Sequence, residues 1–141
     1  MSFAAAFTDK LYAFLICKSK SDTEFILETE PRSIGKISTG RQMVEGKINL
    51  AGLVIQQTDE AWNLKTKRKD FHNKLHSFDW VDDLAALASV EARRFAQTWL
   101  HFWINKYSSG FGPGWTPELT GRRLVRWMHH YLFLTQGCSE K

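Results

Sequence analysis

Apolar residues recur at helical spacing in the first part of the chain. They lie three or four positions apart, so that they fall on one face of a helix: Phe3, Phe7, Leu11, Phe14 and Leu15. A stripe of this kind is typical of a helix that packs one side against other parts of a protein. The pattern therefore predicts a helix over residues 1–20.

The helical period is lost after this helix and returns at residue 70. Proline and glycine interrupt residues 21–69, which are predicted to be irregular apart from a short β-like hairpin at residues 46–57. Gly52 marks the turn between the two short strands. Residues 70–141 are predicted to be helical. The whole pattern thus predicts a mainly α fold with one small β-like segment.

Capping residues mark the starts of three helices in the last part of the chain. Ser, Thr and Asp are favoured immediately before a helix, and acidic side chains are favoured in its first turn. The third helix also has proline at its first position, where a missing N–H costs nothing. The helices and the residues that precede them are 80–88 after Asp79, 90–107 after Ser89, and 117–135 after Thr116.

The second and third of these helices are apolar over about half of their circumference. The arc on the second contains Trp99 and Trp103, and the arc on the third contains Trp127. A helix with so broad an apolar arc packs against more than one neighbour. Three or four helices cannot supply all of these neighbours, so we expect self-association through this aromatic face or packing on a partner.

A glycine-rich loop and the basic face of the third helix form a candidate binding site. Residues 108–115 contain three Gly and one Pro, and glycine lets a ligand approach the backbone closely. Trp faces stack on sugar rings, and Arg binds carboxylate or sulfate in bidentate fashion. The candidate residues for binding an anionic sugar are Trp115, Arg122, Arg123, Arg126 and His130. The alternative is that Trp115 packs the loop onto the core and the Arg face is solvated.

Composition narrows the class of protein only slightly. The 141 residues correspond to one domain or to a piece of a larger one, and a net charge of +4 gives a mild preference for anionic partners. No apolar run is long enough to predict a membrane span, and the N-terminus does not have the form of a signal peptide. Two cysteines near opposite ends favour a reduced, cytoplasmic chain, with the periplasm as a compatible location.

No pattern typical of a metal, cofactor or catalytic site is present. His72 and His76 are four residues apart, but no acidic residue or cysteine lies near them in the sequence. Asp82 and Asp83 point apart on a helix, and their place at its start accounts for them. Glycine-rich phosphate loops and the common hydrolase and zinc-protease motifs are absent. We therefore predict no metal, no cofactor and no catalytic residue.

Three segments of the chain resemble bacterial heparinase II/III-like proteins. They are EPRSIG at 30–35, FDWVDDLAAL at 78–87 and GPGWTPELTGRRLVRW at 112–127. The last is long and unusual in composition, which makes it the most specific of the three. The similarity extends from about residue 30 to about residue 134 and concerns the N-terminal part of such proteins.

The resemblance implies an α/α toroid of stacked helical hairpins, of which this chain would be an incomplete part. Characterised members of the family are polysaccharide lyases that cleave uronic-acid-containing polymers by β-elimination. Their catalytic Tyr and His lie beyond the stretch that this sequence covers, so no catalytic residue carries over and we expect the chain to be inactive alone. The residues that fall on the shared pattern are Trp115, Arg122, Arg123, Arg126 and His130.

The sequence leaves two other functions open beside this one. A small basic helical module could contact nucleic-acid phosphates through Arg122 and Arg126, although the lack of a helix-turn-helix signature argues against nucleic acid. A structural helical domain could instead dimerise through its aromatic face. The expected partners are thus an anionic polysaccharide and the remainder of a lyase, or a second copy.

Overall fold

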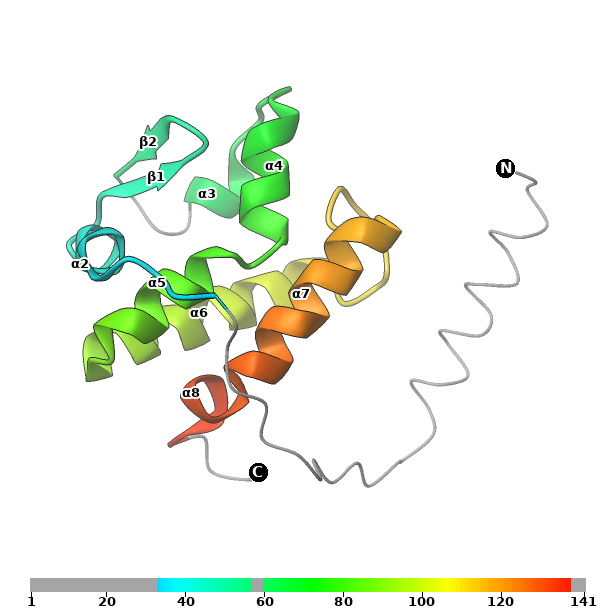
Figure 1. The fold of residues 1–141 in the computed structure, drawn as a ribbon. Helices are drawn as coiled ribbons and strands as arrows, with labels where there is room; N and C mark the ends of the chain where they lie inside the picture. Colours follow the sequence, from blue (N-terminus) through cyan, green and yellow to red (C-terminus); the bar gives the residue numbers. More distant parts are fainter. Residues whose placement is uncertain (1–32, 57–59, 138–141) are drawn as a thin grey trace, which may run out of the picture.

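The structure, a computed structural model, describes residues 33–56 and 60–137. These residues form seven helices and one two-stranded sheet (Figure 1). The predicted mainly α fold is confirmed, and the helix predicted for residues 1–20 lies outside the described residues. The elements are α2 (Ile37–Val44), β1 (Ile48–Leu50), β2 (Leu53–Ile55), α3 (Glu60–Asn63), α4 (Lys69–His76), α5 (Trp80–Leu87), α6 (Val90–Tyr107), α7 (Pro117–His129) and α8 (Tyr131–Thr135).

The small sheet is the hairpin that the sequence predicted. β1 and β2 are antiparallel, with Ile48 opposite Ile55. The turn residues Ala51 and Gly52 have positive φ angles of 52° and 78°, which is the backbone of a tight turn that matches the twist of the strands. Because Ile48, Leu50 and Ile55 are buried, the hairpin covers one side of the core.

Two of the three predicted helix caps are confirmed. Ser89 Oγ accepts a hydrogen bond from the Ala92 N–H at 3.1 Å, and α6 has the predicted bounds. Thr116 Oγ1 accepts one from the Leu119 N–H at 3.3 Å, at the start of α7. Asp79 precedes α5 as predicted, but the prediction that it caps this helix is wrong, because its side chain makes no capping hydrogen bond. Its carboxylate takes part in ion pairs instead.

The single helix predicted for residues 117–135 is in fact two helices. α7 ends at His129 and α8 begins at Tyr131, while His130 between them leaves the helical conformation with φ −113° and ψ 24°. The His130 side chain is buried and contacts α5. The break therefore accompanies a contact between residues far apart in the sequence, and the local pattern of apolar residues continues through it.

The segment predicted to be irregular contains the helix α2, which lies against α5 (Figure 1). The residue before it, Lys36, makes no side-chain cap, and Gly40 in its interior disfavours a helix, so the local sequence does not predict it. A Cβ built on Gly40 would lie 2.2 Å from the Asp83 carbonyl oxygen. Because glycine has no Cβ, α2 and α5 lie closer together than any other residue at position 40 would allow. This close packing stabilises α2.

Gly40→Ala is expected to destabilise the protein by about 1–3 kcal/mol, because the added methyl group overpacks the contact with α5. The matched control is Gly121→Ala in α7, where nothing lies within 4 Å of the new Cβ. There alanine is expected to stabilise the protein by up to about 1 kcal/mol through helix propensity. Urea unfolding measures the free energy of unfolding of both variants. A change of the same sign in both would contradict the close contact between α2 and α5.

Aromatic side chains dominate the core and cover part of the apolar arc of α6, while Phe102 on the same helix is 40% exposed. Trp99 and Trp103 are buried, and the Trp99 ring centroid lies 5.0 Å from that of Trp80 and 5.4 Å from that of Trp62. Trp103 packs edge-to-face on Phe78, with their ring centroids 5.9 Å apart. Such contacts stabilise a core beyond their burial alone. The described elements therefore supply the neighbours that this part of α6 was expected to lack.

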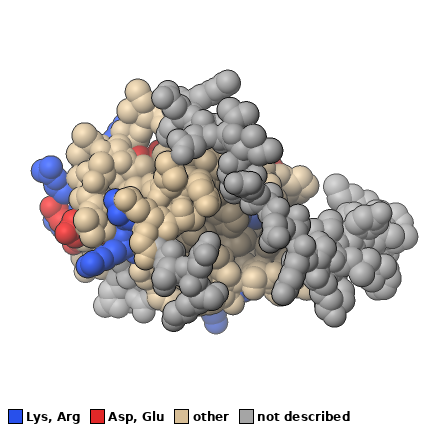
Figure 2. All heavy atoms as spheres, turned by 90° about the horizontal axis from the view of Figure 1, so that it is seen from below, with Lys and Arg blue, Asp and Glu red and all other residues tan. Residues whose placement is uncertain are grey.

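The apolar arc of α7 and α8 is covered only on one side. Leu134 is buried, but Leu124 and Met128 are each 49% exposed and Leu132 is 57% exposed. In Figure 2, which views the molecule from the side on which α8 lies, most of the visible Lys, Arg, Asp and Glu side chains gather at one edge. In the described part of the chain, no helix combines the length and the apolar character that crossing a membrane requires.

Candidate functional site

A buried carboxylate on α5 joins three parts of the fold. Asp82 Oδ2 accepts a hydrogen bond from Ser33 Oγ at 2.6 Å, and Asp82 Oδ1 lies 2.7 Å from Nε2 of His130. Arg126 on α7 forms an ion pair with the same carboxylate, with Nε 3.0 Å from Oδ2. Asp82 thus holds the segment before α2, the body of α7 and the junction of α7 with α8 against α5.

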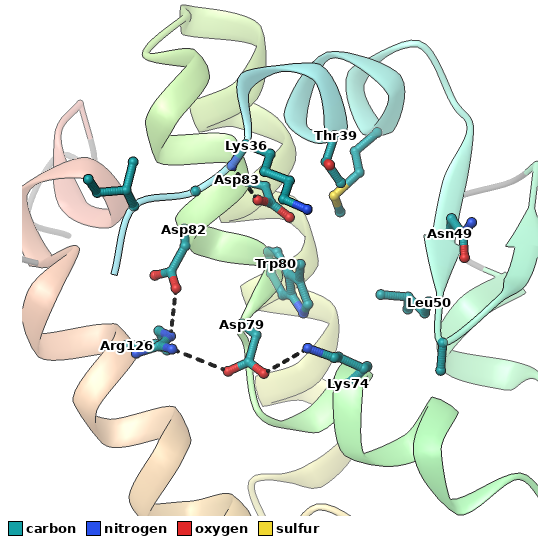
Figure 3. A pocket seen from close by; sticks show the side chains of 14 residues that line it. Lys36, Thr39, Asn49, Leu50, Lys74, Asp79, Trp80, Asp82, Asp83 and Arg126 are labelled. Carbon is teal, nitrogen blue, oxygen red and sulfur yellow. Dashed lines mark hydrogen bonds and ion pairs between the residues drawn. The ribbon is translucent and has the colours of Figure 1, made fainter. Parts of the chain in front are cut away.

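A second carboxylate extends this cluster toward the surface. Asp79 Oδ1 lies 3.6 Å from Nη2 of Arg126, and Asp79 Oδ2 lies 3.4 Å from Nζ of Lys74 on α4. The Arg126 guanidinium is therefore shared between two carboxylates, Asp79 immediately before α5 and Asp82 in its first turn (Figure 3). Two partners fix its position better than one, because the planar fork of an arginine has little freedom once both sides are engaged.

The electrostatics of the cluster favour an ionised Asp82. Burial raises the pKa of this carboxyl, but hydrogen bonds from His130 and Ser33 and the charge of Arg126 outweigh burial and lower the pKa below its usual value. The cluster therefore carries alternating charges along Lys74, Asp79, Arg126 and Asp82. A buried ion pair needs this kind of multiple satisfaction to offset its desolvation.

Two hollows have the ion pair of Asp79 and Arg126 in their walls. The first, of about 290 Å³, is also lined by Gly121, Arg122 and Val125, so it lies along the exposed side of α7. The second, of about 390 Å³, lies between α2, the hairpin and α5 and contains Trp80 in its wall (Figure 3). We call the first hollow the α7 ledge and the second the hairpin pocket.

The structure separates the five candidate residues into two groups. Arg122 and Arg126 line the α7 ledge. His130 contacts the Asp82 carboxylate, which also pairs with Arg126. Trp115 and Arg123 lie instead on the side of α7 that faces α6, because Arg123 is rotated by about 100° from Arg122 along the helix. The five side chains therefore do not form one cradle.

Arg123 lies in an aromatic cage beneath the surface. Its side chain is 1% exposed, and its guanidinium carbon lies 4.2 Å from the ring centroid of Trp103, 5.0 Å from that of Trp115 and 5.5 Å from that of Trp127. Nη1 donates to the Gly114 carbonyl at 2.9 Å. Burial lowers the pKa of Arg123 to about 10, so the group stays charged at neutral pH. This arrangement anchors the glycine-rich loop to the core.

Trp115 is half-buried over this cage. Its indole Nε1 donates to the Tyr107 carbonyl at 2.7 Å, and its ring centroid lies 5.5 Å from that of Trp103. It is 38% exposed, so one part of the ring remains accessible to solvent. The indole packs the loop on α6. This agrees with the alternative prediction from the sequence, that Trp115 packs the loop onto the core.

The two histidines with metal-ligand spacing have other partners. The His76 ring is buried and its Nδ1 accepts a hydrogen bond from Trp103 Nε1 at 3.2 Å. His72 Nε2 lies 2.8 Å from the Thr66 carbonyl oxygen. In residues 33–56 and 60–137, no group of three or more His, Cys, Asp or Glu side chains could hold a metal ion.

Sequence reasoning did not find the acidic half of the site. The sequence predicts Asp79 and Asp82 only at the start of a helix, and it predicts no place in a site for Ser33 or Lys74. Asp79 and Asp82 are three residues apart at the start of α5, and Arg126 and His130 are four residues apart at the end of α7. The opposite charges of the two carboxylates and the guanidinium favour contact between these segments.

Comparisons of the chain with models of protein families, with curated proteins and with solved structures found no match. The resemblance to heparinase II/III-like proteins therefore stays a prediction from the sequence.

Proposed function

We propose that this chain binds anionic polysaccharides along the α7 ledge and has no lyase activity by itself. The observation that carries the proposal is that Arg122 and Arg126, one helical turn apart, line the same surface hollow. The polymer class, uronic-acid-containing saccharides, comes from the resemblance of residues 112–127 to heparinase II/III-like lyases. In that context the chain would be part of an incomplete toroid that completes its fold with the remainder of a lyase.

Arg122 supplies the charge that a ligand would meet first. Its side chain is 55% exposed, and its partner is Glu118, with Nη2 3.1 Å from Oε1. An exposed ion pair four residues apart on a helix contributes only about 0.3–0.5 kcal/mol. Exchange of the Glu118 carboxylate for a carboxylate or sulfate of the ligand therefore costs little, and the guanidinium can bind either group in bidentate fashion.

Arg126 and Asp79 supply orientation rather than net charge. The charge of Arg126 is offset by the two carboxylates that hold it, and those contacts leave its remaining N–H donors in a fixed direction. Asp79 lines the same hollow, and its oxygens can accept hydrogen bonds from sugar hydroxyl groups. A ledge with one exposed, weakly paired arginine and one fixed ion pair fits a ligand that carries both acidic and hydroxyl groups.

The proposed lack of lyase activity rests on the position of His130. β-Elimination requires a base and an acid that both reach the sugar ring. His130, the histidine among the candidate residues, is only 6% exposed, and its Nε2 contacts Asp82. We expect no increase in the ultraviolet absorbance of unsaturated uronates when the chain is mixed with heparin or polygalacturonate. Such an increase would contradict this part of the proposal.

Arg122→Ala is expected to lower the affinity for heparin and polygalacturonate about ten- to a hundredfold, because it removes a charge-assisted contact worth about 1.5–3 kcal/mol. Helicity by circular dichroism should not change, since the side chain is exposed. The matched control is Arg41→Ala on α2, which removes the same charge from an exposed position outside the hollow. Calorimetric titration at low and moderate salt measures both. Equal losses of affinity in the two variants would show that the binding is non-specific charge attraction. A salt-sensitive mobility shift of DNA, with no binding of either polysaccharide, would favour the nucleic-acid alternative.

Self-association is a second candidate, because Leu124, Met128 and Leu132 are exposed on α7 and α8. Apolar residues grouped on one helix face are a common feature of interaction surfaces. Light scattering over a range of protein concentrations tests this directly. A mass that rises with concentration in the absence of any polysaccharide binding would favour a structural, self-associating domain.

A further inference from the structure

The side of α7 that faces away from α5 is apolar and half-exposed. Leu124 and Met128 lie one turn apart there, and each is 49% exposed. Along the helix both are rotated by about 160° from Arg126, whose guanidinium pairs with the carboxylates at the start of α5. We call Leu124 and Met128 the α7 apolar face. Large apolar side chains grouped in this way are typical of a surface that another element covers.

We propose that the N-terminal segment of the same chain, residues 1–20, packs as a helix on the α7 apolar face. This segment lies outside the described residues, and the sequence predicts a helix with one apolar stripe for it. The stripe contains Phe3, Phe7, Leu11, Phe14 and Leu15. An amphipathic helix of this kind needs an apolar surface to pack against, and the α7 apolar face supplies one. The inference does not rest on polysaccharide binding.

The first argument is the place where this segment joins the described fold. Ser33 Oγ donates to Asp82 Oδ2 at 2.6 Å, and His130 Nε2 lies 2.7 Å from Oδ1 of the same carboxylate. Ser33 and His130 also line one small hollow together. Residue 33 is therefore fixed beside the junction of α7 and α8. The preceding part of the chain thus starts from the end of the helix that we propose it covers.

The second argument is length. Residues 21–32 connect the predicted helix to Ser33, and an extended connection of this length spans at most about 40 Å. α7 has 13 residues and is therefore about 20 Å long. The connection can reach every position along α7 from its C-terminal end. As a helix, the stripe from Phe3 to Leu15 extends over about 18 Å, so its length also matches that of α7.

The methyl signals of Met43 and Met128 in the NMR spectrum of the full chain test the contact. Met128 lies on the α7 apolar face, whereas Met43 is 2% exposed in the core and serves as the internal reference. We expect Leu11→Asp to shift the Met128 signal and to leave the Met43 signal unchanged, because a charge in the stripe prevents packing on an apolar surface.

Ile16→Asp is the matched control, because it places the same charge about 140° away from Leu11 on the predicted helix. Isoleucine and leucine have the same size, so the two variants differ only in the side of the helix that they change. The Met128 signal should keep its wild-type position in Ile16→Asp. An unchanged Met128 signal in Leu11→Asp, or equal shifts in both variants, would overturn the inference.

Amide hydrogen exchange tests the contact from the other side. Leu124→Ser combined with Met128→Ser should speed exchange in residues 1–20 about tenfold, because the segment loses the surface that protects it. The control combines Val54→Ser with Val90→Ser, which removes two exposed apolar side chains, 61% and 50% exposed, from other elements. Circular dichroism verifies that both variants stay folded. Exchange in residues 1–20 that is equally fast in the wild type and in the α7 variant would contradict the contact.

A second copy of the chain is the other possible occupant of the α7 apolar face. Packing within one chain predicts a light-scattering mass of 16.3 kDa and a Met128 signal that does not change with protein concentration. If the mass and the Met128 signal both change with concentration, the face binds a second copy and the inference is wrong. That result would support the self-associating domain, and loss of heparin binding in Arg122→Ala would still test the proposed function separately.

Discussion

Arg123→Ala is expected to destabilise the protein by about 3–5 kcal/mol, the range for truncating a large buried side chain. The guanidinium fills the space between Trp103, Trp115 and Trp127, with its central carbon 4.2 Å from the nearest ring centroid. Alanine would leave a cavity there. It would also leave the buried Gly114 carbonyl without its 2.9 Å donor, and an unsatisfied buried group costs about 1–3 kcal/mol.

Arg122→Ala is the matched control for this prediction, because it removes the same side chain from the adjacent position on the exposed side of α7. Its effect on stability is expected to be within about 0.5 kcal/mol. Arg123→Met would fill most of the cavity but donate no hydrogen bond, so it should recover only part of the loss. Urea unfolding at neutral pH measures all three variants. A loss of less than about 1 kcal/mol for Arg123→Ala would contradict the cage.

The elements that were predictable from the sequence are those with local signals. α6 has Ser89 before it, a steady apolar period along its length and glycine soon after its end, and its bounds agree with the prediction. The hairpin has Gly52 at a turn that needs a positive φ angle. In each case the residues that decide the structure lie within a few positions of one another, so a single sequence contains the information.

The elements that were missed depend on contacts between distant residues. α2 has no cap and contains Gly40, and its stability comes from close packing against α5. The break after α7 coincides with the bond from His130 to Asp82, which lie 48 positions apart. Neither feature follows from propensity or periodicity, because tertiary contacts override both.

The candidate site was predictable only where a local signal, the spacing of residues along one helix, decides which side chains lie together. The spacing of Arg122 and Arg126 places them on one face of a helix, and the structure puts them on one ledge. The sequence predicts Arg123 as a binding residue on the basic face of this helix, but the structure buries its side chain, and a charged residue is rarely buried without an acidic partner. Its burial depends on three Trp residues that come from α6, from the glycine-rich loop and from α7, and the local pattern of the sequence does not predict that these three elements meet.

Lowering the pH from 6.5 to about 4 is expected to cost about 3 kcal/mol of stability through His76 alone, at 1.36 kcal/mol per unit of pKa shift. The pKa of His76 is lowered from 6.5 to about 4, first by burial and then by the positive charges of His72, Arg123 and Lys106. The folded protein therefore keeps His76 neutral while the unfolded chain takes up a proton. Stability is full above pH 6.5 and decreases as the pH falls toward the folded pKa.

The variant that tests this origin is His76→Asn, whose amide oxygen can replace Nδ1 as the acceptor for the Trp103 indole N–H. It should unfold more easily than the wild type at neutral pH but show a much smaller loss between about pH 6.5 and pH 4. His101→Asn, at an exposed position on α6, should keep the full wild-type dependence of stability on pH.

Asp82 acts in a separate pH range. Its lowered pKa stabilises the fold above pH 3.8, and this contribution is lost only at more acidic pH. Urea midpoints measured through both ranges separate the two groups, and an unchanged slope in His76→Asn would show that another residue causes the acid sensitivity.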